Sequence, residues 1–415
     1  MFVSNLLLSI HNLTQLNYKE PTGELKYMKT TIGIRLVWHI IFDIPLPLMP
    51  FGINSIYVSA TDPGVVYGIE DHSAYLDNFS EGAYKVWELG YSPVTAEREL
   101  LRGPISNISS PNGWHSQHLF STIGENSVAT PHAVGGREMG VVGPGGAGGV
   151  GLVFDTLVPS TNAAVVQVFY FTNAFHDYTE PLGFTRASGN FEGPDAINFH
   201  IDFIAGSSIT VRPLGQRSLI RVGFTNTRRT SFDGGIMAHE LTHGMTMRLT
   251  GGAHNVDCLL TPEAMALGEG WGDFMAMAVI LNVTHSKEFE FRIGEYITPG
   301  TGIRARPYSG MRRVKWSQVD LSERHVAGEN WATMLLSVLW NFVESFTMGA
   351  EGLEVNYGRD GVPVGGRNYL VKLVIEALKL QPCEPGFIQA RDAILDADVA
   401  LTGGKAKCEI WKGFA

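Results

Sequence analysis

The sequence predicts an α+β protein in which a strand-rich first half is followed by a mainly helical second half. Before residue 82, apolar and polar residues alternate in short segments, as they do in strands. After residue 163, apolar residues recur at intervals of three and four, as they do in helices. Hydrophobic residues make up 44% of the 415-residue chain and charged residues only 17%, which favours a globular protein over a disordered chain.

The first part of the chain, residues 1–82, is expected to form a small strand-rich meander. Alternating segments such as LVWHIIFDI and SIYVSA are accompanied there by the turn signals PTGE and TDPG. Residues 83–160 are rich in Gly, Pro and Ser, which predicts loops and short strands. Residues 195–225 are again typical of strands.

The helical pattern begins near residues 163, 236, 263, 331, 368 and 386. After the first 82 residues we therefore expect two lobes. The first, residues 83–250, is strand-rich and ends in a helix at 236–249, and the second, residues 251–415, is helical. A cleft is expected where the two lobes meet.

Charge and hydropathy argue against two classes of partner. The net charge of −10 does not suit a protein that neutralises nucleic-acid phosphates. No apolar stretch reaches the roughly 18 residues that a membrane-spanning helix needs. The opening MFVSNLLLSIHN lacks a preceding Lys or Arg and a clear cleavage site, so it is a poor secretory signal, and we expect the N-terminus to be incomplete.

The chain has three cysteines, Cys258, Cys383 and Cys408. An odd number leaves one unpaired in an oxidising compartment. Cys383 and Cys408 flank one helical segment and could form a disulfide, but three reduced cysteines fit the spacing nearly as well. Sequons that suit a secretory route occur at Asn12, Asn78, Asn107 and Asn282.

The segment HELTH suggests a metal site. On a helix, His239 and His243 lie one turn apart, so both imidazoles can bind one ion at about 2.0–2.1 Å. Glu240 is offset by one residue, where it can take a proton from a bound water whose pKa the ion lowers to about 7. The alternative, a solvated polar face, is disfavoured by the neighbouring residues, which are apolar: Ile236, Met237, Ala238, Leu241, Met245 and Met247.

A third ligand is available in the next helical segment, LGEGWGDF. Glu269 can complete a set of two histidines and one glutamate, which leaves a catalytic zinc its open position. Asp273, one turn later, can accept the other ring N–H of a ligating histidine. The alternative is that both are surface carboxylates, although like charges at this spacing repel mildly without a cation.

The two motifs together, HELTHGMTMRLTGG and LGEGWGDF, resemble the fungalysins, secreted fungal zinc metallopeptidases related to thermolysin-like enzymes. The resemblance runs from about residue 83 to the end and includes the segments at 170–192, 302–309, 325–341 and 378–415. Upstream, PTGELKY resembles the tail of the family's inhibitory propeptide. The resemblance implies a two-lobed thermolysin-like fold preceded by a propeptide remnant.

The resemblance also implies roles for individual residues. His239, His243 and Glu269 would bind one catalytic Zn²⁺, Glu240 would be the general base, and Asp273 would hold a ligating histidine.

Three further residues are assigned with less support from the motifs. His325 would donate to the oxyanion of the tetrahedral intermediate, and Asp320 would orient its imidazole. Arg304 would contact substrate carbonyls. A helix-capping or surface role for His325 and a surface role for Arg304 are the alternatives.

The expected function is that of a secreted zinc endopeptidase, made as a zymogen, glycosylated and monomeric. Its partners would be protein or peptide substrates and its own propeptide as inhibitor. One segment departs from the family: residues 195–233 lack the TPPDG turn beside the edge that pairs with substrate. A zinc-binding pseudopeptidase or peptide-binding protein is therefore an alternative, and a metal-free binding protein is a third. The sequence does not decide on structural Ca²⁺.

Overall fold

The structure is a computed structural model that describes residues 7–9, 22–30, 33–41, 55–62, 65–70, 82–106, 108–111, 113–115, 121–131, 152–225, 227–349 and 352–415. The chain divides into two compact units, one built mainly from residues 1–79 and the other mainly from residues 80–415. The sequons at Asn12, Asn78 and Asn107 lie outside the described residues.

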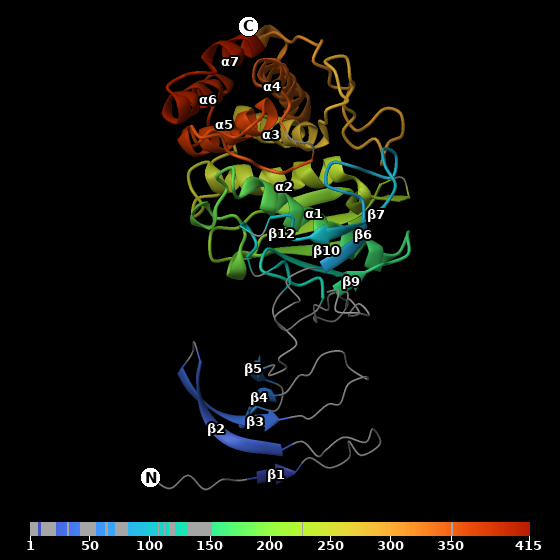
Figure 1. Ribbon diagram of the computed structural model, residues 1–415, viewed down its shortest axis with the longest axis vertical. Helices are drawn as coiled ribbons and strands as arrows, with labels where there is room; N and C mark the ends of the chain where they lie inside the picture. Colours follow the sequence, from blue (N-terminus) through green and yellow to red (C-terminus); the bar gives the residue numbers. More distant parts are fainter. Residues whose placement is uncertain are drawn as a thin grey trace. The chain divides into compact units, whose positions relative to one another are not determined.

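The described residues of the first unit form one antiparallel sheet of five strands in sequence order (Figure 1). Its strands are β1 (Leu7–Ser9), β2 (Thr22–Thr30), β3 (Gly33–Ile41), β4 (Ser55–Ser59) and β5 (Val66–Glu70). Neighbours in sequence are neighbours in the sheet, so the predicted meander is confirmed.

The described part of the second unit contains two sheets. A three-stranded sheet has the order β7-β6-β9, and a larger sheet has the order β11-β12-β10-β8 with β13 paired to β12. The strands are β6 (Gly82–Val86), β7 (Glu99–Gly103), β8 (Ser127–Pro131), β9 (Leu152–Phe154), β10 (Ile197–Ala205), β11 (Ser207–Thr210), β12 (Leu219–Thr225) and β13 (Arg228–Arg229). In the larger sheet, β12 runs parallel to β10 and antiparallel to β11, which leaves β11 at the edge.

Seven helices complete the described part of this unit: α1 (Thr161–Thr179), α2 (Gly234–Leu249), α3 (Pro262–Ile280), α4 (Arg324–Phe346), α5 (Gly366–Leu380), α6 (Phe387–Thr402) and α7 (Lys407–Phe414). Short 3₁₀ turns lie at Arg186–Ser188, Gly193–Asp195, Thr230–Phe232 and Trp316–Gln318. No helix of the described residues combines the length and apolar character needed to cross a membrane. All the described strands lie before residue 230 and six of the seven helices lie after it, and this arrangement confirms the α+β class.

The helices that carry the site have clear local signals at their ends. Asp233 caps α2 by accepting a hydrogen bond from the Ile236 N–H, and Thr261 caps α3 by accepting from the Ala264 N–H. After α2 the chain turns through Gly251, whose φ of +80° is in the left-handed region that favours glycine. Helix α2 then packs against α3 and against β11.

Candidate metal centre

Two imidazoles face one another on α2. The rings of His239 and His243 have centroids 4.6 Å apart and lie perpendicular to one another. His239 is only 7% exposed, and its apolar neighbours Met237, Ala238 and Leu241 are buried. Helix α2 is therefore an interior helix, and the alternative of a solvated polar face is wrong.

Glu269 comes from α3, which packs along α2, and its carboxylate reaches both imidazoles. Oε2 of Glu269 lies 3.3 Å from Nε2 of His239 and 3.7 Å from Nε2 of His243. Ligand atoms bound tetrahedrally at about 2.0–2.2 Å from zinc would be roughly 3.3–3.6 Å apart. These three side chains therefore fit one tetrahedral ion with a fourth position left over.

The charges around the cluster favour a cation. Burial lowers the pKa of His239, but its contacts with Asp273 and Glu269 outweigh burial and raise the pKa to about 9. Burial raises the pKa of Glu269, but the contacts with His239 and His243 outweigh burial and lower it to about 2. Burial, reinforced by the charge on His239, lowers the pKa of His243. The ionised Glu269 and the neutral His243 are in the state that a metal ion requires of its ligands, and an ion bound here would displace the proton that His239 holds.

Asp273, one turn after Glu269 on α3, holds the other side of His239. Its Oδ1 lies 2.8 Å from Nδ1 of His239, so Nε2 is the nitrogen left to face Glu269. Arg304 donates to both oxygens of the same carboxylate, at 2.6 and 2.8 Å, and the Tyr308 hydroxyl donates to Oδ2 at 2.5 Å. This pairing holds the pKa of Asp273 well below its usual range, against the effect of burial.

The structure gives Arg304 a second role, besides the predicted contact with substrate, as a partner of Asp273. Its guanidinium is engaged by Asp273, although the side chain also borders the cavity described below. Tyr308 was missed altogether. The signal in the sequence was weak, because both residues lie in an irregular loop with no periodicity to align them with α3.

A cavity of about 540 Å³ opens in front of the three ligands. Its polar lining includes His239, Glu240, His243, Glu269 and His325. Its apolar wall consists of Ile209, Ile236, Met247, Leu259, Leu260, Met265, Ile293, Ile297 and Ile303. A largely apolar hollow with a few convergent polar groups is the usual form of a substrate site.

The unusual segment 195–233 forms one side of this cavity. It folds into β10 to β13, and residues 206–209 at the start of the edge strand β11 border the hollow. The Ser207 hydroxyl donates to Oε1 of Glu240 at 2.7 Å. Thus the segment keeps an edge strand at the site although the familiar turn is absent, and Ser207 is a site residue that sequence reasoning missed.

His325 lies at the first turn of α4 and borders the same cavity. Its Nε2 is 3.4 Å from Oε1 of Glu269, and its side chain is 42% exposed. Arg324 beside it also reaches Glu269, with Nε 3.2 Å from Oε1. The structure therefore places His325 beside Glu269, one of the three proposed metal ligands.

The predicted orienting role of Asp320 is wrong. Oδ1 of Asp320 accepts the N–H of Ser322, whereas Nδ1 of His325 lies 2.7 Å from Oε1 of Glu323. Glu323 is the N-cap of α4 and accepts the N–H groups of His325 and Val326. His325 is in the first turn of α4, two residues after the N-cap Glu323. The Glu323 carboxylate therefore contacts the imidazole, and Asp320 does not.

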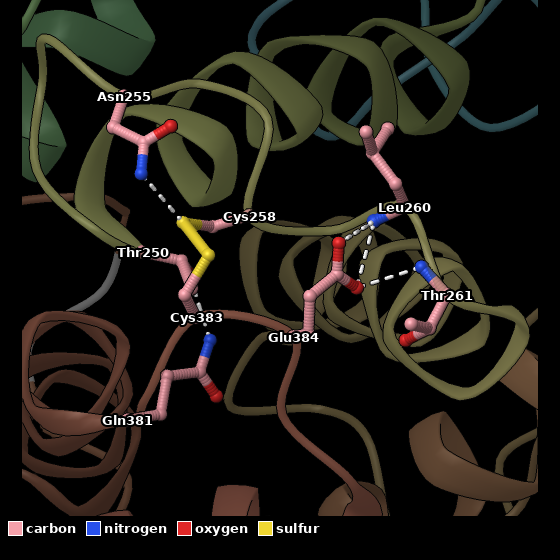
Figure 2. The surroundings of a disulfide bond; sticks show 8 residues. All are labelled: Thr250, Asn255, Cys258, Leu260, Thr261, Gln381, Cys383 and Glu384. Atoms are coloured by element: carbon pink, nitrogen blue, oxygen red, sulfur yellow. Dashed lines mark hydrogen bonds between the residues drawn. A yellow bond between two sulfur atoms is a disulfide. The ribbon is translucent and has the colours of Figure 1, made fainter.

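The disulfide that the sequence allows between Cys383 and Cys408 is not formed. The disulfide joins Cys258 and Cys383, whose Cα atoms are 4.6 Å apart (Figure 2), and Cys408 is a free, exposed thiol on α7. The alternative of three reduced cysteines is wrong as well. The partners are 125 residues apart in sequence, and only the packing of the α2–α3 loop against the α5–α6 loop brings them together.

Further contacts reinforce this junction. The Glu384 carboxylate accepts the N–H groups of Leu260 and Thr261, and Gln381 donates to the Thr250 hydroxyl (Figure 2). Leu260 lines the cavity, so the disulfide and Glu384 together hold part of the cavity wall in place.

Comparisons with known proteins agree with this geometry. The family model described as fungalysin metallopeptidase (M36) matches residues 83–415. Extracellular metalloproteinase 10 of Coccidioides posadasii (strain C735) is 35% identical, with 95% of this chain and 66% of the relative covered. Extracellular metalloproteinase MEP of Leptosphaeria maculans is 33% identical, with 96% and 66% covered. The chain thus spans just under two thirds of the length of these relatives.

Among solved structures, the precursor of protealysin, a metalloproteinase from Serratia proteamaculans, aligns with a TM-score of 0.46 and 11% identity. The alignment covers 70% of this chain and 84% of that one.

Proposed function

Because the chain belongs to the fungalysin metallopeptidase family (M36), we propose that it is a secreted zinc endopeptidase that cleaves peptide bonds of proteins or peptides. The observation that carries the proposal is the convergence of His239, His243 and Glu269 beside Glu240 in one cavity. The names of the relatives, extracellular metalloproteinases, support the same reaction and location.

Zinc is the ion that this donor set fits best, since two imidazoles and one carboxylate are a common catalytic zinc set. A bound zinc ion would polarise the substrate carbonyl and make a water more acidic. Asp273 and Arg304 hold His239 in the tautomer that presents Nε2, and Arg304 is also proposed to border the bound substrate.

Glu240 is proposed to be the general base and proton donor of the reaction. Its carboxylate borders the cavity on the turn of α2 that carries both histidines, where it can take a proton from the attacking water. The same group can then pass the proton to the leaving amine, which must be protonated before it departs. Metal binding and proton transfer are thereby assigned to adjacent side chains on one helix.

His325 is proposed to stabilise the negative charge that develops on the attacked carbonyl oxygen. Glu323 holds Nδ1, so the other ring nitrogen faces Glu269 and the cavity. A donor placed where charge develops stabilises the transition state more than the substrate. Asp320 is not part of this proposal.

Strand β11 is proposed to align the substrate. It lies at the edge of its sheet and borders the cavity, so its outer backbone groups can pair with an extended peptide. This arrangement favours an active enzyme over a silent zinc-binding protein.

A casein-digestion assay with and without a metal chelator tests the proposal. Cleavage that the chelator abolishes and added zinc restores is the expected result. Stoichiometric zinc without cleavage would support the pseudopeptidase instead, and absence of bound metal by elemental analysis would support a metal-free binding protein.

Residues 1–82 are proposed to be part of an inhibitory propeptide, followed by a strand-rich lobe at 83–250 and a helical lobe at 251–415. In support, the family model begins at residue 83, whereas the relatives align over 95% of the chain and so extend upstream of it. N-terminal sequencing of the active secreted protein, which we expect to be monomeric, would locate the cleavage. An active product that retains residues 1–82 would contradict removal.

A further inference from the structure

The proposed general base has a partner that belongs to a different element. Oγ of Ser207, the first residue of β11, donates to Oε1 of Glu240 on α2 at 2.7 Å. Thirty-three positions separate the two residues in sequence. Glu240 is only 8% exposed, and hydrogen bonds to a buried carboxylate are short and strong.

The fold fixes the position of Ser207 with several backbone contacts. Strand β10 loses its regular register with β12 between Ile201 and Ala205, and the chain then passes through Gly206 at a φ of +85°. The Gly206 N–H donates to the Phe224 carbonyl, and the Gly206 carbonyl accepts from the Gly223 N–H and the Thr230 hydroxyl. Irregularities of this kind beside a site re-aim a side chain.

Pairing within the sheet also restricts the backbone of Ser207. Ser207 pairs with Val222 of β12, so its backbone is held on the side away from the cavity. The sheet therefore sets the position of the Ser207 side chain, and the packing of α2 against β11 brings Glu240 to it.

We propose that Ser207 is a positioning residue for Glu240, an inference that rests on the proposed peptidase function. Its hydroxyl holds Oε1, which restricts the carboxylate to one orientation and leaves Oε2 for proton transfer. A base held in its productive geometry reacts faster than one that samples several rotamers. Ser207 does not itself touch the reacting atoms in this role.

The test compares three variants with the wild-type chain: Ser207→Ala, Ser207→Thr and the control Ser317→Ala. Ser317 is an exposed serine in the 3₁₀ turn at Trp316–Gln318 and does not border the cavity. We expect S207A to lower kcat about tenfold with KM within about twofold, because the lost hydrogen bond acts on the base and not on substrate affinity. S207T retains a hydroxyl and should recover most of kcat, and S317A should match the wild type.

Zinc content and the thermal midpoint are measured for each variant, and both should be unchanged in S207A. Crystal structures of the zinc-loaded wild type and S207A provide a readout other than activity: Glu240 should adopt one rotamer in the first and more than one in the second. A wild type in which Ser207 Oγ lies beyond hydrogen-bonding distance of Glu240 overturns the inference.

The kinetic measurements distinguish a failure of the role of Ser207 from a failure of the proposed function. An active wild type with an equally active S207A refutes the role of Ser207 alone, as does a loss that S207T shares in full. A wild type that cleaves no substrate refutes the proposed function, and the role of Ser207 with it.

Discussion

Nδ1 of His239 lies 2.8 Å from Oδ1 of Asp273, and Arg304 donates hydrogen bonds to both oxygens of the same carboxylate. Helix α3 therefore supplies both Glu269, which faces the proposed ion, and the acid that sets the tautomer of His239. The orientation of the histidine depends on this helix pair and on the loop that carries Arg304.

Replacing Asp273 with Asn should weaken zinc binding by about 10- to 100-fold, because His239 loses a charged acceptor and Arg304 its partner. Competition with a chelator of known affinity measures the change. Asp396→Asn, an exposed aspartate on α6, is the control and should bind zinc as the wild type does. Equal affinities for the two variants would contradict the assigned role of Asp273.

The change Glu240→Gln should leave zinc bound and lower kcat by about 10²- to 10⁴-fold, since the amide cannot accept the proton of the attacking water. Elemental analysis and a peptide-cleavage assay on the same sample check both parts. Exposed Glu97→Gln serves as control. An active E240Q would remove Glu240 from the mechanism.

A matched pair of variants tests whether Glu323 or Asp320 orients the imidazole of His325. Glu323→Gln should lower kcat by about tenfold, because a neutral amide stabilises a donating imidazole less than a carboxylate does. Asp320→Asn should have no effect, because Asp320 contacts Ser322 instead. Glu323 also caps α4, so the assay is run well below the measured thermal midpoint of each variant. The reverse order of effects would restore the role first assigned to Asp320.

Removing the disulfide by the double change Cys258→Ser and Cys383→Ser should lower the free energy of unfolding by about 2–5 kcal/mol. Cys408→Ser should change it by less than about 0.5 kcal/mol, because that thiol is free and exposed. Denaturant unfolding of each variant gives the comparison. A Cys408→Ser protein that is as unstable as the double variant would contradict the Cys258–Cys383 pairing.

Asp233, the buried N-cap of α2, predicts a pH dependence of stability. Burial raises its pKa from 3.8 to about 6, although the N–H groups of Ile236 and Tyr296 oppose the rise. The folded state therefore binds this proton more tightly than the unfolded state. Its contribution to stability is complete below pH 3.8 and is lost as the pH rises through about 6.

The stability of the wild type relative to Asp233→Asn should accordingly fall by about 1 kcal/mol between pH 5 and pH 7. Denaturant unfolding at both pH values measures the difference, with the Asn variant cancelling the titration of all other groups. A relative stability that rises over this interval would show that the pKa of Asp233 is not raised.

Much of the local structure followed from the sequence because its signals are local. Periodicity placed the helices that became α2 and α3, and the spacing of His239, Glu240 and His243 needs only one helix to bring them together. Glu269 lies in the next helical segment, where the sequence offers it as a third ligand, and the resemblance to a family supports that assignment. Helical spacing also predicts Asp273, which lies one turn from Glu269 on the same helix.

Contacts between remote segments were decided only by the tertiary structure. Cys258 pairs with Cys383 and not Cys408, Glu323 and not Asp320 reaches His325, and Ser207 reaches Glu240 from an edge strand. Helical spacing specifies which residues share a face, because that depends on the backbone of one segment alone. Which loop, cap or strand meets that face depends on how remote segments pack together. The order of residues in one sequence does not specify the distances between such segments.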